Sequence, residues 1–314
     1  MTKNKLKATV VVPYYNAGSY VNETMQSILS QTRLPDEIII VNDGSTDELS
    51  LRKLDEMEKI KNVNIVHQEN SGVGAALTKG AKLASGEVVF EVDSDDILDK
   101  KYVEKFMNVF ENDETVDGVT CGYNLFFDGV SWREEKNVHR KYMPDGLEIP
   151  RVFFENCAGG QNSAFRKSAL EKIGYWDKRF STAQDWGIWL QFLERGLKQK
   201  IIPEYLYYYR VRKGSLLQSG SKDYDLDGNL AISMGLILHG DKNYFTAKDY
   251  DREKQNWKKQ QKITVKENRK IQNNFSFNRA KQLYKEFVLC VNREAWKNSL
   301  RRTKNYLKYG VGKK

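Results

Sequence analysis

Short β-branched runs alternate with longer amphipathic stretches along the first third of the chain. The strand-like runs cover residues 9–13, 37–41, 63–67 and 87–92, and the helix-like stretches cover 19–31, 48–59 and 72–84. Strands separated by helices of about ten to fifteen residues are typical of βαβ units. The pattern therefore predicts an α/β fold, with a mostly parallel central sheet and helices on both of its faces.

The alternation becomes less regular in the second half of the chain. The predicted elements there are a helix at 99–111, strands at 119–127 and 130–133, a helix at 185–195 and a strand at 199–212. Asp128-Gly129 between the first two strands is a hairpin turn signal. From about Leu226 onward the pattern indicates helix. We therefore expect a folded body over 1–225 and a helical extension over 226–314.

Composition narrows the class of protein. The chain has 314 residues, 40% of them hydrophobic and 12% aromatic, which is enough for a full globular core. It lacks the apolar run of about eighteen residues that a membrane-spanning helix needs, and its first residues lack the apolar core of a signal peptide. The three cysteines (Cys121, Cys157 and Cys290) are far apart and odd in number, which suits a reducing compartment. We expect a cytoplasmic protein.

The net charge of +9 is unevenly distributed. Residues 242–314 carry 21 Lys or Arg and 6 Asp or Glu, whereas the rest of the chain carries 30 basic and 36 acidic residues. Within this basic tail, apolar residues recur at helical spacings between 280 and 291. Such a tail can bind an anionic membrane surface, bind an anionic polymer such as a phosphate-containing glycan, or pack on another subunit in a homo-oligomer.

Polar residues follow each of the four predicted N-terminal strands. The segments are Tyr15-Asn16, Asp43 to Asp47, Asn70-Ser71-Gly72 and Asp93 to Asp96. In a parallel sheet, ligands bind beyond the carboxyl ends of the strands, so these segments are predicted to form one site.

The acids at the end of the fourth strand indicate a cation-binding site. Asp93, Asp95 and Asp96 lie within four residues, where their mutual repulsion lowers stability unless a positive charge intervenes. Mg²⁺ and Mn²⁺ prefer such oxygen ligands and often share them with substrate phosphates. An ordinary solvated turn that caps the next helix is the alternative. Asp43 also has two interpretations: it either accepts hydrogen bonds from a base or ribose, or it is part of a turn and helix cap. Asn70-Ser71-Gly72 is predicted to cap a helix, and the N-terminus of that helix would favour a diphosphate.

Six segments in order carry a family resemblance. They are VVVPYYNAGSYVNETMQSILSQT, EIIIVNDGSTDE, HQENSGVGAALTKGA, GEVVFEVDSDD, SAFRKSALEKIGYWDKRF and AQDWGIWLQFLERG. Together they resemble the family 2 glycosyltransferases of GT-A fold, of the bacterial cell-surface polysaccharide or teichoic acid type. The resemblance runs from about Thr9 to Ser215, roughly two thirds of the chain.

The resemblance implies an inverting, metal-dependent enzyme. It would move a sugar from a nucleotide-diphosphate sugar, in most relatives a UDP-sugar, to a hydroxyl of a cell-surface glycan, a teichoic acid or a lipid-linked acceptor. The cofactor would be Mn²⁺ or Mg²⁺. Residues 1–97 would form the nucleotide-binding half and 98–225 the acceptor half. If the basic tail binds anionic lipid, which is one of its three alternatives, the cytoplasmic enzyme would lie peripherally at the inner face of the membrane.

The resemblance also implies roles for individual residues. The nucleotide-sugar would be bound by Pro13, Tyr15, Asn16, Asp43, Asn70, Gly72, Asp93, Ser94, Asp96, Gly160, Arg210, Arg212 and Ser215. Asp95 would be the principal metal ligand, with Asp93 as the second. Asp185 would be the catalytic base, and Gln184 and Trp186 would contact the acceptor, Trp186 by stacking on a sugar ring.

The chain departs from the family pattern at three points. Gln184 stands where the family has Glu, which puts acceptor contacts in question. Arg212 stands where many members have a metal-binding His; an Arg cannot ligate a cation, and is better suited to pairing with phosphate. Ala76-Leu77-Thr78 replaces a frequent Ala-Arg-Asn, so a basic contact is missing there.

Two other functions compete with this interpretation. A polyanion-binding protein would explain the basic tail, but the clustered acids of the body would repel phosphate unless a divalent cation intervened. A nucleotidyltransferase would need a Gly-rich basic loop where Pro13 to Asn16 stand. No nucleic-acid-binding signature is present, and we expect no nucleic-acid partner.

Overall fold

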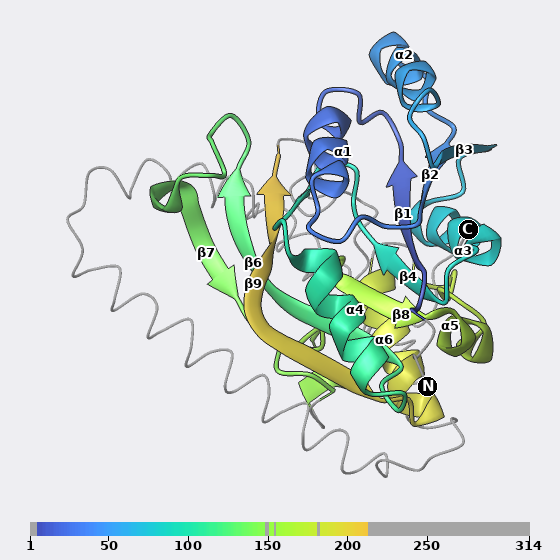
Figure 1. The fold of residues 1–314 in the computed structure, drawn as a ribbon, viewed down its shortest axis with the longest axis vertical. Helices are drawn as coiled ribbons and strands as arrows, with labels where there is room; N and C mark the ends of the chain where they lie inside the picture. Colours follow the sequence, from blue (N-terminus) through green and yellow to red (C-terminus); the bar gives the residue numbers. More distant parts are fainter. Residues whose placement is uncertain (1–4, 148–150, 154, 181–182, 213–314) are drawn as a thin grey trace, which may run out of the picture. The chain divides into compact units, whose positions relative to one another are not determined.

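The computed structural model describes residues 5–147, 151–153, 155–180 and 183–212 (Figure 1). Up to Val211 these residues belong to one compact unit. The predicted extension at 226–314 and the boundary at 225 lie outside the described residues. Among the residues that are described, no helix has the length and apolarity needed to span a lipid bilayer.

The unit is built on one sheet with helices between its strands (Figure 1). The strands are β1 (Ala8–Tyr14), β2 (Glu37–Asp43), β3 (Val63–Gln68), β4 (Val88–Glu91), β5 (Ile97–Leu98), β6 (Gly118–Phe127), β7 (Val138–Tyr142), β8 (Ser163–Arg166) and β9 (Gln199–Val211). The helices are α1 (Val21–Leu29), α2 (Glu48–Met57), α3 (Val73–Leu83), α4 (Tyr102–Asn112), α5 (Lys167–Ile173) and α6 (Gln184–Arg195), with short 3₁₀ turns at Glu135–Asn137 and Arg151–Phe153. The strand order is β3-β2-β1-β4-β8-β6-β9-β5, and β7 pairs with β6.

The first four strands pair in parallel, as the alternating pattern predicts. β1 lies between β2 and β4, and β3 lies on the outer side of β2. Every residue of β1 is buried, which explains why the strand is a continuous apolar run rather than an alternating one. Because all four strands run the same way, their carboxyl ends lie along one edge of the sheet.

Helices cover both faces of the sheet. One face packs Val10, Val12 and Phe90 against apolar residues of α1, α2 and α4. The opposite face carries Val11, which approaches α3 so closely that a Cβ at Gly80 would collide with its Cγ1. Glycine at position 80 therefore lets α3 lie directly on β1 and β2. The α/β architecture expected from the sequence is confirmed.

The second half of the sheet mixes the two strand directions. β8 pairs antiparallel with β4 and β6, whereas the long strands β6 and β9 pair in parallel. The pattern did not predict β8 or α5. The hairpin expected around Asp128-Gly129 forms, but its second strand begins at Val138, so the prediction of a strand at 130–133 is wrong. Trp132 instead packs on the ring of Tyr208, 4.9 Å between centroids.

Candidate active site

The loops after β1 and β2 are tied together at the edge of the sheet. The side chain of Asn16 accepts a hydrogen bond from the backbone N–H of Thr46 (2.9 Å), and the backbone N–H of Asn16 donates to Ser45 (3.0 Å). Pro13 is buried inside β1, while Tyr15 is 48% exposed beside these loops. Tyr15 and Asn16, two of the three residues predicted to bind the nucleoside, are therefore accessible, whereas Pro13 is buried in the strand that precedes them.

Asp43, the last residue of β2, holds the start of α3. Its carboxylate accepts hydrogen bonds from the side chain of Gln68 (2.8 Å) and from the backbone N–H groups of Ser71 (2.8 Å) and Gly72 (2.9 Å). The helix N-terminus that was predicted to attract a diphosphate thus already faces a carboxylate. The N-cap of α3 is Gly72, which makes no side-chain cap, and Asn70 is exposed before it.

The loops after β2 and β3 touch at a glycine. A Cβ on Gly44, whose φ is +75°, would lie 2.9 Å from the backbone nitrogen of Asn70. Only glycine combines this left-handed conformation with so close an approach. The structure therefore brings Asn16, Asp43, Asn70 and Gly72 together, as predicted, and Asp47 caps α2 by accepting from the N–H of Ser50.

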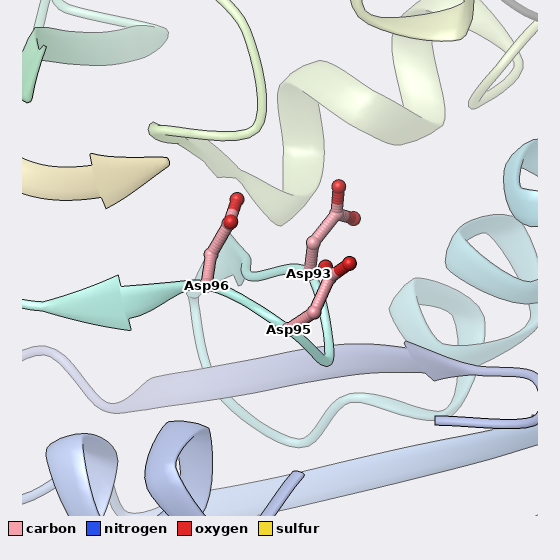
Figure 2. A group of neighbouring side chains, drawn as sticks. All are labelled: Asp93, Asp95 and Asp96. Atoms are coloured by element: carbon pink, nitrogen blue, oxygen red, sulfur yellow. The ribbon is translucent and has the colours of Figure 1, made fainter. Parts of the chain in front are cut away.

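The three clustered acids lie on a single turn between β4 and β5. Figure 2 shows their side chains leaving the turn on the same side, and one oxygen from each lies within 4.8 Å of the others. Asp93 and Asp95 are partly buried, and Asp96 is only 1% exposed. Ser94, between them, is also buried. The carboxylate cluster expected from the sequence is therefore present in the fold.

Arg210 of β9 anchors this turn. Its backbone N–H donates to Asp96 (2.8 Å), and its guanidinium Nε donates to the carbonyl of Asp95 (2.8 Å). The remaining nitrogens pair with Glu23 (2.5 Å) and Asp128 (3.5 Å). Arg210 is 6% exposed, so its charge is already engaged inside the protein. A contact with the nucleotide-sugar stays a prediction; the contacts seen hold the acid turn in place.

The electrostatics of the turn favour a cation. Burial, together with the charges of Asp95 and Asp93, raises the pKa of Asp96 well above its ordinary value. Beneath the turn, Glu91 at the end of β4 is fully buried, and neither of its carboxyl oxygens has a hydrogen-bond partner among the described residues. Burial and the charges of Asp93 and Asp185 raise its pKa strongly. An all-oxygen donor set, in which the charges of Asp95 and Asp93 raise the pKa of Asp96, fits a hard divalent ion such as Mg²⁺ or Mn²⁺.

Asp185 stands in the first turn of α6 with defined partners. One oxygen accepts from the backbone N–H of Trp186 (2.8 Å), and the other accepts from the side-chain amide of Asn156 (2.9 Å). A Cβ on Gly160 would lie 3.5 Å from the second oxygen, an ordinary contact distance, so the loop at Gly160 runs close to the carboxylate. Burial raises the pKa of Asp185 to about 6, against hydrogen bonds that lower it. A carboxylate with this pKa is suited to act as a base near neutral pH.

The two acceptor residues predicted next to Asp185 are both buried. Gln184 is 5% exposed, and its side-chain oxygen has no partner in the described part of the chain. Trp186 is 2% exposed, and its indole N–H donates to the carbonyl of Val152 (2.6 Å). Its ring also meets the ring of Phe180 at 6.4 Å between centroids. The ring therefore has no open face, and the prediction that it stacks on a sugar is wrong.

The last predicted residues lie at the end of the described chain. Arg212 follows β9 and is partly buried. Ser215 lies outside the described residues. Their roles as nucleotide-sugar contacts stay predictions.

Two residues near Asp185 were not foreseen. Glu91 links the two acidic groups, because its pKa responds to both Asp93 and Asp185. Its signal was present in the sequence, since an acid inside a buried parallel strand is rare. Asn156 orients Asp185 from an irregular loop, and no local pattern marks it.

A mostly parallel sheet, with a carboxylate turn after β4 and an aspartate in the first turn of α6, is the arrangement that the resemblance to the GT-A glycosyltransferases leads us to expect. Residues 9–174, more than half of the chain, match the sequence model of the family described as Glycosyl transferase family 2. The chain belongs to this family.

Curated relatives carry related names. The chain is 30% identical over 223 residues to the putative glycosyltransferase EpsH of Bacillus subtilis, covering 68% of this chain and 63% of the relative. It is 31% identical over 181 residues to a glucosyl-dolichyl phosphate glucuronosyltransferase of Haloferax volcanii, covering 55% and 56%. The chain thus spans about six-tenths of the length of these relatives.

Solved structures support the fold. Crystal structures of S. aureus TarS 1-349, in complex with UDP and with UDP-GlcNAc, resemble this chain with TM-scores of 0.56 and 0.58 at 21% identity. They cover 76% of this chain and 67% and 68% of TarS 1-349. At this identity the likeness establishes the fold.

Proposed function

We propose that the chain is an inverting, metal-dependent glycosyltransferase that moves a sugar from a UDP-sugar to a hydroxyl of a cell-surface glycan, a teichoic acid or a lipid-linked acceptor. The observation that carries this proposal is the Asp185 carboxylate, whose pKa is about 6, near the acid turn at the edge of the sheet. Asp93 and Asp185 both lie near enough to the buried Glu91 for their charges to raise its pKa, which supports the idea that both groups act on one substrate complex.

The reaction needs one proton acceptor. The acceptor hydroxyl attacks the anomeric carbon, the bond from that carbon to the diphosphate oxygen breaks, and the nucleoside diphosphate leaves from the opposite face. Asp185 takes the hydroxyl proton. A base whose pKa lies near neutrality is ionised enough to be ready and basic enough to accept the proton, a contribution of about 10²–10⁴-fold. Asn156 keeps one carboxylate oxygen in a fixed direction.

The nucleotide would bind over the ends of β1 and β2. UDP is the first nucleotide to test, because TarS, which shares the fold, forms complexes with UDP and UDP-GlcNAc. Tyr15 offers an exposed ring. Asp43 already accepts three hydrogen bonds, and a carboxylate accepts about four. One acceptor direction is therefore left for a base N–H or a ribose hydroxyl.

Asp95 and Asp93 are the residues that would hold Mn²⁺ or Mg²⁺. A divalent ion bound there supplies positive charge beside the diphosphate and offsets the repulsion among the acids. Asp96 is the less suitable ligand, because it is buried and one of its oxygens is taken by the N–H of Arg210. The basic composition of 242–314 supports peripheral attachment to an anionic membrane.

The test is a screen for nucleotide-sugar hydrolysis by the full chain, with water in place of the acceptor. We expect one class of donor to be hydrolysed slowly when Mn²⁺ or Mg²⁺ is present and not in a chelator. The variant Asp185→Asn tests the proposed base. Its matched control is Asp177→Asn, a change in an acid paired with Arg179, which should keep the activity. If no nucleotide-sugar is bound or cleaved, and only polyanions bind, the polyanion-binding function replaces this one.

A further inference from the structure

Three tyrosines from three strands form a cluster of ring contacts, with Tyr123 in the middle. Tyr123 of β6 is the cross-strand partner of Tyr142 on β7, with ring centroids 5.2 Å apart and planes inclined by 33°. On its other side Tyr123 meets Tyr209 of β9 at 5.8 Å. We call Tyr123, Tyr142 and Tyr209 the tyrosine platform.

The platform differs from the tyrosines of the core. Tyr102 and Tyr207 are at most 1% exposed and pack among apolar side chains, whereas all three platform residues are partly exposed. Within the described part of the chain, the hydroxyl groups of Tyr123 and Tyr209 make no hydrogen bond. Tyr142 donates only a long one, 3.4 Å, to the carbonyl of Asn156. Partly exposed rings, two of them with hydroxyl groups that make no hydrogen bond to the described residues, offer a ligand both apolar area and polar contacts.

The platform lies beside the proposed catalytic groups. Burial raises the pKa of Tyr123, and the charges of Asp185 and Asp96 raise it further, against the charge of Arg140. The pKa of Tyr209 is raised by burial and then by the acids of the turn. Asn156 connects the platform to the base, because its carbonyl accepts from Tyr142 while its amide donates to Asp185.

Strand order separates the platform from the nucleotide edge. β4, which carries the acid turn, has β1 and β2 on one side and β8, β6 and β9 on the other. The loops that hold Tyr15 and Asp43 therefore lie on one side of the turn, and the platform strands lie on the other. A substrate that reaches Asp185 from the platform side meets the donor across the turn.

We propose that the tyrosine platform binds a pyranose ring of the acceptor saccharide, with the ring face on Tyr123 and Tyr209 and its hydroxyl groups toward Asp185. This assignment rests on the proposed function. The C–H face of a pyranose is apolar and matches an aromatic ring, while its rim of hydroxyl groups matches phenols and the carboxylate. An acyclic polyol has no such face, so the platform selects cyclic sugars over open-chain acceptors.

The experiment measures contact with simple sugars by saturation-transfer NMR, using the full chain with and without UDP and Mg²⁺. The probes are methyl glycosides of glucose, galactose and N-acetylglucosamine, with glycerol and ribitol as acyclic controls. The variants are Tyr123→Leu and Tyr209→Leu, which keep apolar volume, and Tyr209→Phe, which keeps the ring. Tyr208→Leu is the matched control, because the next residue along β9 faces the other way and packs on Trp132.

We expect at least one pyranoside to bind the wild type and the acyclic polyols to bind weakly or not at all. Both leucine variants should weaken pyranoside binding roughly tenfold, Tyr209→Phe by less than about threefold, and Tyr208→Leu not at all. UDP affinity within about twofold of wild type would show that the leucine variants are folded.

Three results overturn the assignment. They are pyranoside binding that is unchanged in both leucine variants, equal binding of pyranosides and acyclic polyols, and loss of UDP affinity together with pyranoside affinity, which would mean a structural role. The proposed function fails separately, if the wild type cleaves no donor. In that case the NMR measurements of sugar binding made without UDP still test whether the tyrosine platform binds a pyranose.

Discussion

Replacing Asp185 by Asn should raise stability while it removes transfer. Burial raises the pKa of this carboxyl from its ordinary 3.8 to about 6. As the pH rises between these values, the unfolded chain releases its proton before the folded protein does. The folded state therefore binds more protons in this range, and its stability falls as the pH rises. Above about pH 6 the ionised carboxylate destabilises the fold by its full amount.

The amount follows from the size of the pKa shift. Roughly two pKa units at about 1.4 kcal/mol each give about 3 kcal/mol as an upper bound, since the group is partly accessible to water. The amide introduced by Asp185→Asn would also turn an N–H toward the amide of Asn156, at a cost of about 1 kcal/mol that does not change with pH. The free energy of unfolding of Asp185→Asn, taken relative to that of wild type, should therefore increase by about 2 kcal/mol when the pH is raised from about 4.5 to about 8.

Urea unfolding of wild type and variant at both pH values measures this difference. Asp177→Asn provides a control of opposite sign: although burial opposes it, the guanidinium of Arg179 lowers the pKa of Asp177, so its stabilising contribution is present at high pH and lost as the pH falls. In the same samples, transfer by Asp185→Asn should be about 10²–10⁴-fold slower, with UDP affinity retained.

Two results would refute this reasoning. A stability difference between wild type and Asp185→Asn that is the same at both pH values would mean that the pKa of Asp185 is not raised. Transfer within a few-fold of wild type would mean that another group accepts the proton, even if the stability behaves as expected.

Three further changes test the surroundings of Asp185. Mn²⁺ with UDP should raise the melting temperature of the wild type but not that of Asp95→Asn, and an equal rise in both would return the acid turn to a purely structural role. Asn156→Ala removes a hydrogen bond that lowers the pKa of Asp185, so the midpoint of the acid limb of the pH–activity profile should move upward; a midpoint that stays in place speaks against the contact. Glu91→Leu removes two buried oxygens without partners and should raise the free energy of unfolding by about 1–3 kcal/mol, whereas a less stable variant would mean that Glu91 has an essential partner.

The sequence alone predicted the elements whose signals are local. The strands β1 to β4 and the helices between them follow from apolar periodicity, because each βαβ unit buries its own residues against the next strand. The acid turn and the polar loops could be assigned to one edge for the same reason, since parallel strands place their carboxyl ends together. Asp185 was found through the family resemblance, because a single acid in the first turn of a helix is otherwise an ordinary helix-start residue.

Only the tertiary structure decided the contacts between distant segments. β8 is four residues long and carries no distinctive pattern, and it is a strand because β4 and β6 lie on either side of it. Nothing in the local sequence distinguishes Trp186 from an exposed tryptophan, but its indole N–H donates to the carbonyl of Val152 inside the core. Asn156 meets Asp185 from a position 29 residues away, and Tyr123 meets Tyr209 only because β6 and β9 are neighbours. Local sequence cannot encode such pairs, because which side chains meet depends on the order and direction in which the strands pack.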